Sequence, residues 1–453
     1  MQITFRGAAG EVTGSLHELN TRRLRLLLDC GAFQGSGVAV ALKNRETVPD
    51  AESVDGVFLS HGHLDHCGRL PQLYRDGFRG PIFCTPATAD VAVVMLEDAA
   101  RIAAERAPDD APAPFTRADV AGVEALMEPL EPGRWHRLSS DLSVRFSPAG
   151  HILGAAICEL KVRDAGEDRR VVYAADLGRR GLPLIPDPVQ VPGCDVLLVE
   201  STYADSVHPA VEEIIEELAT IVGDVIARGG RVIVPAFSIG RTQLLAWLLN
   251  ELIATDRVPA VPIFVDSPLA HRITALYRRH AEAVRAERRS LFQRNTEEAF
   301  PNVQCVRRRI DSIALNDVDR PCVIIAGGGM CEGGRVLYHL RHALEDERNA
   351  VLLVSYQAPE TLGRRLASAA PSVRIFDRNC PVRATVHQLH GLSAHADALD
   401  FKWWFEGLAD EGGIGQAFVV HGEGPAADTQ AQLLQPYCDE DPVVPQHGET
   451  WEV

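Results

Sequence analysis

The sequence predicts an α/β protein with two domains, one made of stacked sheets covered by helices and the other built on a parallel sheet. The length of 453 residues exceeds what one hydrophobic core ordinarily holds. In about the first 200 residues, apolar strand-like runs end in Gly, Asp, His or Ser, and few long helices separate them. From about Pro209 the sequence alternates strands with helices, a pattern that favours a parallel sheet in its own domain.

The N-terminal part contains seven runs that we expect to form strands, with a helix expected from Thr88 to Arg106. The runs are "MQITFRGA", "LRLLLDCG", "GVFLSHGH", "GPIFCTP", "LSVRFSPAGH", "RVVYAADLG" and "CDVLLVEST". In the second part we expect helices in "PAVEEIIEELATIVGDVIARGG" and "GRTQLLAWLLNEL", and strands in "RVIVPAF", "VPIFVDS", "PCVIIAGGG" and "NAVLLVSYQ". A last group contains the strand "ATVHQLHG", a helix that starts in "SAHADALDFKWWFEGL", and the strand "GQAFVVHGE".

Composition argues against several classes of protein. The longest apolar runs, such as "VLLV", are far shorter than the roughly 18 residues of a membrane span, so we expect no membrane association. The first residues lack the basic start and apolar core of a secretory signal. Ten cysteines are scattered singly, which favours reduced thiols and a cytoplasmic protein. A formal net charge of −17 argues against nucleic-acid binding through bulk charge, but not through a local cationic site such as bound metal ions.

One turn, "SHGHLDHCGRLPQL", concentrates metal ligands directly after the apolar stretch "VDGVFL". His61, His63, Asp65 and His66 occupy positions that would splay around a helix but can converge in a loop. Asp65 would then lie near the start of a helix through "CGRLPQLYRDG", where the helix dipole favours a carboxylate. Imidazoles together with carboxylates suit zinc, and otherwise manganese or iron.

A catalytic metal site on this turn needs a ligand from elsewhere in the chain. His151, in "SPAGHILGAA", follows a strand and is flanked by small residues that allow close approach of the backbone. Asp176, in "VVYAADLGR", lies at a strand end, where functional carboxylates tend to project. Each residue is a weak candidate alone, since a lone histidine at a strand end is more often structural, and their order along the chain adds weight.

The order of these motifs resembles the metallo-β-lactamase superfamily: HxHxDH after a strand, then a histidine in "GH", then an aspartate at a strand end. Asp29 in "LLLDCG" matches the residue that buttresses the ligand loop in that superfamily. "VLLVESTY" with Glu200, "GLSAHAD" with His395 and "FVVHGE" with His421 resemble the three extra motifs of its β-CASP group of nucleases. "VPAFSIGRTQ", "VDSPLA", "GGGMCEGGRVLYHL" and "YQAPETLGRRL" resemble the inserted domain of that group.

The resemblance implies a metallo-β-lactamase αββα sandwich at 1–205 and 381–453, interrupted at 206–380 by a Rossmann-like parallel-sheet β-CASP domain. It also implies two metal ions, zinc by first choice and manganese or iron as alternatives. One ion would be held by His61, His63 and His151, the other by Asp65, His66 and His421, and Asp176 would bridge them.

The implied activity is hydrolysis of single-stranded RNA by a metal-activated hydroxide that attacks phosphorus in line. We expect an endoribonuclease, and the sequence leaves 5′-exonuclease action open. Asp65 would orient the hydroxide or take its proton. His395 would supply the proton that the departing 3′ oxygen needs, and Glu200 would orient that imidazole and keep it protonated.

The inserted domain is expected to bind the RNA. The stretch "GGGMCEGG" offers backbone N–H groups at Gly328 and Gly329, without the GK[ST] of a P-loop. Further candidates are Arg241 and Arg364 as phosphate partners, and Ser267 and Gln357 in strand-to-helix turns. Helix capping or domain packing explains each of them equally well. The sequence also departs from the family pattern, because the loop before "GM" has glycines in place of serines and Ser355 stands where a glycine is common before "YQ".

Three other functions compete with the ribonuclease. A hydrolase of small esters or thioesters would need neither the His395 and Glu200 motifs nor the large insertion. A DNA nuclease of this group would be expected to carry long extra segments. A non-catalytic RNA-binding subunit would have no reason to keep seven metal ligands. We therefore favour the ribonuclease, and the sequence leaves open whether it forms a homodimer.

Overall fold

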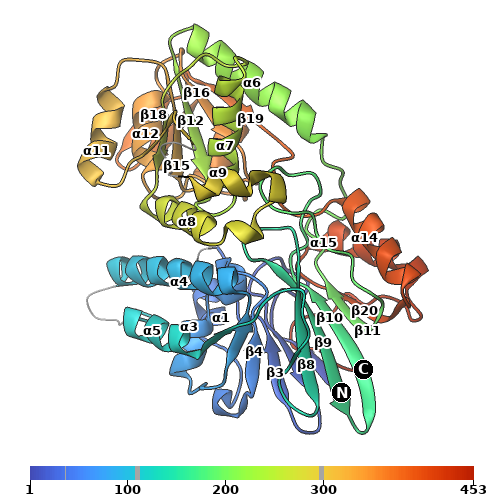
Figure 1. Ribbon diagram of the computed structural model, residues 1–453. Coiled ribbons are helices and arrows are strands. Elements are labelled where there is room, and N and C mark those ends of the chain that lie inside the picture. The colour runs from blue at the N-terminus through green and yellow to red at the C-terminus, as the bar shows by residue number, and fades with distance from the viewer. Residues whose placement is uncertain (36, 108–112, 295–299) are drawn as a thin grey trace. The chain divides into compact units, whose positions relative to one another are not determined.

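The computed structural model describes residues 1–35, 37–107, 113–294 and 300–453, which form two compact units (Figure 1). The first unit consists of Met1–Val207 with Ala394–Val453, and the second of His208–Ser393. The sequence places the limits after residues 205 and 380. The second limit falls later in the structure because β19 (Thr385–Gln388) pairs in parallel with β16 (Ala350–Leu353) of the inserted unit.

Two sheets pack face to face in the first unit. Apolar side chains from both sheets, among them Phe5, Phe58, Phe146 and Phe418, form one core between them. The first sheet has the order β21 (Thr450–Glu452), β1 (Gln2–Phe5), β2 (His17–Asn20), β3 (Arg25–Leu28), β4 (Gly56–Phe58), β5 (Ile82–Cys84) and β6 (Met127–Pro129). The second has the order β20 (Ile414–Val419), β11 (Cys194–Val199), β10 (Glu167–Ala174), β9 (Ala156–Asp164), β8 (Leu142–Pro148) and β7 (His136–Arg137).

Helices cover the outer faces of this sandwich, with α3, α4 and α5 on one side and α14 and α15 on the other (Figure 1). Helix α4 begins two residues before the expected Thr88, because the Thr85 side chain accepts a hydrogen bond from the Thr88 N–H and proline suits the first helical position. The helices are α1 (Val38–Lys43), α2 (Leu64–Cys67), α3 (Leu70–Arg75), α4 (Pro86–Arg106), α5 (Arg117–Leu126), α14 (Ala398–Asp410) and α15 (Gly424–Leu434), with short 3₁₀ turns at Ala51–Ser53 and Gln435–Tyr437.

The single helix expected after the ligand turn is two short helices, α2 and α3, that are separated at Gly68 and Arg69. The guanidinium of Arg69 is buried and donates hydrogen bonds to the carbonyl oxygens of Gly31 and Glu46. These bonds attach the break between α2 and α3 to the segment that follows β3. Asp65 lies in the first turn of α2, as expected.

The second unit is built on a fully parallel sheet with the order β14-β13-β15-β12-β16-β19. Its four central strands are near-continuous apolar runs, as expected for strands that are buried on both faces of the sheet. The strands are β12 (Arg231–Ala236), β13 (Ile263–Asp266), β14 (Val303–Cys305), β15 (Cys322–Gly327), β16 and β19, beside a hairpin of β17 (Ser372–Ile375) and β18 (Arg378–Pro381). The helices are α6 (Val211–Ala227), α7 (Arg241–Ala254), α8 (Pro268–Arg279), α9 (Arg289–Gln293), α11 (Arg309–Ala314), α12 (Val336–Ala343) and α13 (Leu362–Ala367), with 3₁₀ turns at Ala281–Ala283, Ala286–Arg288 and Leu315–Asp317. The α/β fold predicted from the sequence is confirmed.

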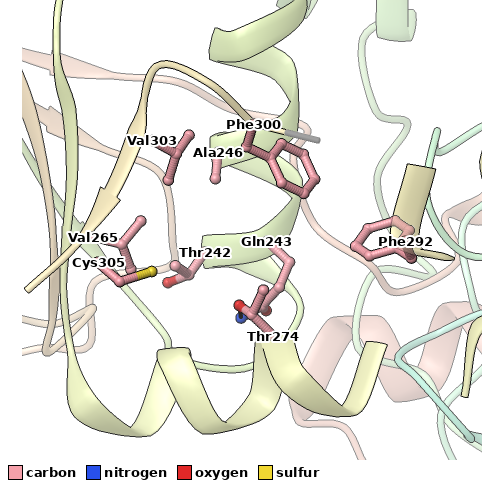
Figure 2. Close-up of a pocket in the computed structure, with 9 residues that line it drawn as sticks. All are labelled: Thr242, Gln243, Ala246, Val265, Thr274, Phe292, Phe300, Val303 and Cys305. Atoms are coloured by element: carbon pink, nitrogen blue, oxygen red, sulfur yellow. Dashed lines mark hydrogen bonds between the residues drawn. The ribbon is translucent and has the colours of Figure 1, made fainter. Parts of the chain in front are cut away.

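A cavity of about 20 Å³ lies inside the second unit, between α7 and its neighbours (Figure 2). A space of this size holds roughly one water molecule and is far too small for a nucleotide. The Oε1 atom of Gln243, which lines the cavity, has no hydrogen-bond partner among the described residues, so a buried water would satisfy it. The lining residues are Thr242, Gln243, Ala246, Val265, Thr274, Phe292, Phe300, Val303 and Cys305.

None of the helices in the described part of the chain combines the length and the apolar character needed to cross a bilayer.

Candidate metal centre

The ligand turn begins two residues after β4 and is held by close backbone packing. Ser60 donates two hydrogen bonds of 2.7 Å to the Asp29 carboxylate, one from its N–H and one from its hydroxyl. A Cβ atom at Gly62 would lie 2.4 Å from a methyl carbon of Val91, and one at Gly31 would lie 1.5 Å from the carbonyl oxygen of Asp65. Only glycine at these two positions lets the turn pack this closely.

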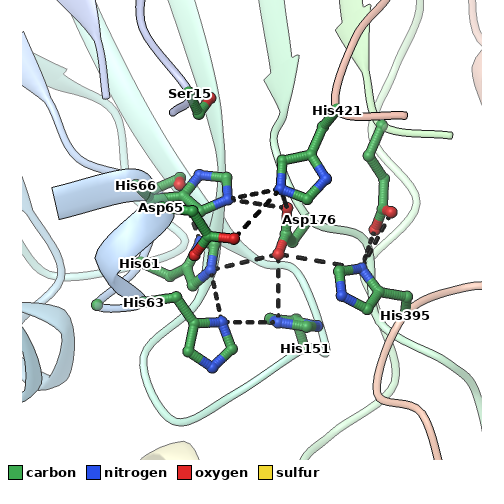
Figure 3. Close-up of polar contacts among 12 residues, drawn as sticks. Ser15, His61, His63, Asp65, His66, His151, Asp176, His395 and His421 are labelled. Atoms are coloured by element: carbon green, nitrogen blue, oxygen red, sulfur yellow. Dashed lines mark hydrogen bonds and ion pairs between the residues drawn. The ribbon is translucent and has the colours of Figure 1, made fainter. Parts of the chain in front are cut away.

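Four predicted ligands from three segments converge in a first group (Figure 3). The Nδ1 atom of His63 lies 3.1 Å from Nε2 of His61 and 3.2 Å from Nε2 of His151. One carboxylate oxygen of Asp176, Oδ2, lies 3.4 Å from Nε2 of His61 and 3.3 Å from Nε2 of His151. Three ring nitrogens and a carboxylate oxygen therefore surround one point.

The remaining predicted ligands form a second group on the other oxygen of Asp176 (Figure 3). The Nε2 atoms of His66 and His421 are 3.1 Å apart, and Oδ2 of Asp65 lies 3.8 Å from the latter. Oδ1 of Asp176 lies 3.2 Å from Nε2 of His66 and 3.5 Å from Nε2 of His421. Each oxygen of this carboxylate thus faces a different group of ligands.

The electrostatics of the first group fit a metal cofactor. Burial lowers the pKa of His63 to about 3 and also lowers the pKa of His61 and His151. These imidazoles are therefore neutral, which is the form that binds metal.

In the second group burial lowers the pKa of His66, but Asp176 and Asp29 outweigh burial and raise it well above its usual value, so His66 must release a proton when a metal binds. Burial alone would raise the pKa of Asp176, but the charges of His421 and His66 hold it well below its usual value. The buried Oδ1 of Asp176 has no hydrogen-bond partner among the described residues, and a cation would satisfy it.

The ligands are held in place by Asp29, which the sequence singles out, and by several residues that it does not. The Asp29 carboxylate accepts hydrogen bonds of 2.7 Å from Nδ1 of His66 and from the Tyr173 hydroxyl, which directs Nε2 of His66 toward the second group. The Thr202 hydroxyl lies 3.2 Å from Nδ1 of His421. Ser15 and Ser60 extend this network to Tyr173 and His61. Tyr173 carried one sequence signal: it lies three positions before Asp176, in the apolar second half of β10.

His395 and the buried Glu200 form a pair next to Asp176. Nδ1 of His395 lies 3.0 Å from both carboxylate oxygens of Glu200 and 3.9 Å from Oδ2 of Asp176. Glu200 is fixed in turn by a 2.7 Å hydrogen bond from the backbone N–H of Leu177. Burial lowers the pKa of His395, but the charges of Glu200 and Asp176 outweigh burial and raise it to about 9. In the metal-free protein His395 therefore carries a proton at neutral pH.

The predicted substrate-binding residues all lie in the second unit, and the structure gives several of them a local role. The Ser267 hydroxyl accepts a hydrogen bond from the Ala270 N–H, so it caps α8. The Gln357 amide donates to the carbonyl oxygens of Gly329 and Ser355. The remaining candidates are Arg241 at the start of α7, Gly328 with a φ of +115°, and Arg364 on α13. Their contact with RNA stays a prediction.

Comparison with known proteins adds domain matches and relatives. Residues 24–226 match the beta-lactamase superfamily domain, residues 242–366 the Beta-Casp domain, and residues 379–445 the Zn-dependent metallo-hydrolase RNA specificity domain. Ribonuclease TTHA0252 of Thermus thermophilus is 39% identical over 427 residues, which cover 93% of each chain. Transcription termination factor FttA of Methanocaldococcus jannaschii is 32% identical over 458 residues, which cover 96% of this chain and 69% of that protein. The crystal structure of a protein of unknown function from Enterococcus faecalis V583 shares the fold, with a TM-score of 0.58 at 15% identity over 99% of both chains.

Proposed function

Because this chain belongs to the β-CASP family of metallo-β-lactamase-fold ribonucleases, we propose that it hydrolyses phosphodiester bonds of single-stranded RNA at a site that holds two zinc ions. The observation that carries the proposal is the Asp176 carboxylate, whose two oxygens face two separate groups of ligands. The ligands proposed for one ion are His61, His63 and His151, and those for the other are Asp65, His66 and His421. Asp176 is the proposed bridge.

Bound divalent ions of this kind supply Lewis-acid stabilisation of the phosphate and a water of lowered pKa. The side chains of the protein handle the protons. Burial would raise the pKa of Asp65, but the neighbouring His421 and the charge of His66 outweigh it and lower that pKa, so Asp65 is ionised and suits orienting the attacking water by accepting a hydrogen bond from it. Figure 3 shows Asp65 and His395 on opposite sides of Asp176, an arrangement that suits attack from one side and departure on the other.

In this mechanism His395 donates a proton to the departing 3′ oxygen, and Glu200 keeps His395 protonated and oriented. The His395 side chain is 20% exposed whereas Glu200 is fully buried, so only the histidine can reach a substrate. The assignment rests on the raised pKa of His395 and on the fixed position of Glu200 behind it.

Glu200→Gln is expected to move the alkaline limb of the pH–kcat profile to lower pH. His395 acts while protonated, and its pKa of about 9 depends on the Glu200 charge, so activity is present below that pKa and lost as pH rises through it. Without the charge, burial dominates and lowers the pKa. The measurement is kcat on labelled RNA against pH, with zinc content checked by elemental analysis. An alkaline limb that stays in place would contradict the role given to Glu200.

The proposed function is tested with labelled single-stranded RNA in linear and circular form, with and without a chelator. We expect chelator-sensitive shortening of the linear RNA that zinc restores. Linearisation of the circular RNA would identify an endonuclease, and resistance of the circle would identify a 5′-exonuclease. Ester or thioester turnover without RNA cleavage would favour the small-substrate hydrolase, and RNA binding without cleavage at any metal concentration would favour a non-catalytic subunit.

A further inference from the structure

Two exposed aromatic rings lie at the carboxyl ends of adjacent strands in the parallel sheet of the second unit. Phe237 follows β12 and is 41% exposed, and Tyr356 follows β16 and is 62% exposed. Because β12 and β16 pair in parallel, both rings leave the sheet at the same edge. Rings of this size are normally mostly buried, so two on one edge point to a binding surface.

The Phe237 ring lies against the glycine loop that follows β15. A Cβ atom at Gly329 would be 3.1 to 3.2 Å from three carbon atoms of this ring, so the ring and the loop backbone are in close contact. Strand β12 lies between β15 and β16 in the sheet, which places Phe237 between the loops that contain Gly329 and Tyr356.

Neighbouring side chains fix the Tyr356 loop as well. The buried amide of Gln357 donates a 2.9 Å hydrogen bond to the carbonyl oxygen of Gly329 and a 2.8 Å bond to that of Ser355, which ties the two loops together. The guanidinium carbon of Arg364 lies 5.7 Å from the centre of the Tyr356 ring. The two rings are therefore presented on tied loops, which reduces the entropy lost when a ligand binds.

We propose that Phe237 and Tyr356 stack on unpaired bases of the RNA substrate, an inference that rests on the proposed function. Every base offers a π-face, so such a platform tolerates any sequence but requires single-stranded RNA. The formal net charge of −17 gives RNA no general attraction to the protein, and stacking contributes binding that does not depend on net charge. The backbone N–H groups of the glycine loop and the Arg364 guanidinium lie next to the platform and suit the phosphates between the stacked bases.

The test compares an RNA oligonucleotide with an abasic one, in the full chain carrying His395→Ala so that the RNA stays intact. Fluorescence anisotropy measures the Kd for a labelled single-stranded oligoadenylate and for an abasic oligonucleotide of the same length. We expect Phe237→Ala and Tyr356→Ala each to weaken oligoadenylate binding roughly 5- to 150-fold and to leave abasic binding nearly unchanged. Phe237→Tyr and Tyr356→Phe keep the π-face and should retain most of the affinity.

Matched control variants distinguish whether the two rings stack on bases or only support the loops that carry them. Phe376→Ala removes a 45% exposed ring from the β17–β18 hairpin of the same unit and should not change either Kd. Phe237→Leu and Tyr356→Leu keep apolar bulk without an aromatic face, so they should bind like the alanine variants while remaining folded. Equal losses for the two oligonucleotides, or no loss for either, would overturn the inference. Chelator-sensitive RNA cleavage by the unmodified protein tests the proposed function separately, because it is measured without any of these variants.

Discussion

Replacement of Asp176 by asparagine is expected to reduce RNA cleavage by at least about 100-fold and to release at least one of the two proposed ions. The reason is geometric, since Oδ1 and Oδ2 face different groups of histidines and an amide offers only one oxygen. Loss of a hydrogen-bond partner of a metal ligand typically costs roughly 10- to 100-fold, and loss of a bridging ligand should exceed that. Zinc content by elemental analysis and kcat on labelled RNA are the two measurements.

Asp176→Asn should remain folded, because the side chain keeps its shape and changes one buried polar group, at a cost of about 1–3 kcal/mol. Thermal denaturation of metal-free protein checks this. Asp224→Asn is the matched control, since it removes the same charge from an exposed position on α6 of the second unit and should leave zinc content and activity unchanged. An Asp176→Asn protein with full zinc and full activity would show that this carboxylate does not bridge two ions.

Replacement of His395 by alanine is expected to lower turnover on RNA about 10²- to 10⁴-fold while zinc content and thermal stability stay close to those of the unmodified protein. Nδ1 of His395 is occupied by Glu200, and His395 belongs to neither of the two groups assigned to the ions. The loss should be much smaller on bis(p-nitrophenyl) phosphate, because nitrophenolate is a stable anion that leaves without a proton.

Comparing turnover on RNA with turnover on bis(p-nitrophenyl) phosphate is the more decisive measurement. A structural role for His395 would lower turnover on both equally, whereas a proton donor is needed only for the RNA leaving group. His342→Ala, an exposed histidine on α12, is the control for histidine removal. Loss of zinc in the His395→Ala protein would mean that His395 is itself a metal ligand.

In the second unit, α6, α7 and the four central strands were predictable because each carries a strong local signal. In α6, the buried residues Ile214, Leu218, Val222 and Val225 recur at helical spacing. The sheet to which a strand belongs is not a local property, however. The run "ATVHQLHG" reads as a strand, but only tertiary pairing places it beside β16 in the inserted unit.

The metal ligands stood out in the sequence for a similar reason, since histidines and an aspartate are dense in one turn and the remaining motifs follow in order. The residues that hold those ligands gave little signal. Tyr173 and Thr202 each contribute one hydroxyl, and a single hydroxyl on a strand or loop is as common in a structural role. The sequence does not single out the two exposed rings, Phe237 and Tyr356, because the exposure of a side chain depends on the packed structure.

The pairings of β20 with β11 and of β21 with β1 have a consequence for biosynthesis. A ribosome makes residues 1–207 first and then the whole second unit before it reaches His421. During that time the nascent polypeptide holds most of the ligands but lacks one of them and both closing strands. The proposed metal centre and both sheets of the first unit are therefore completed only after the whole second unit has been synthesised.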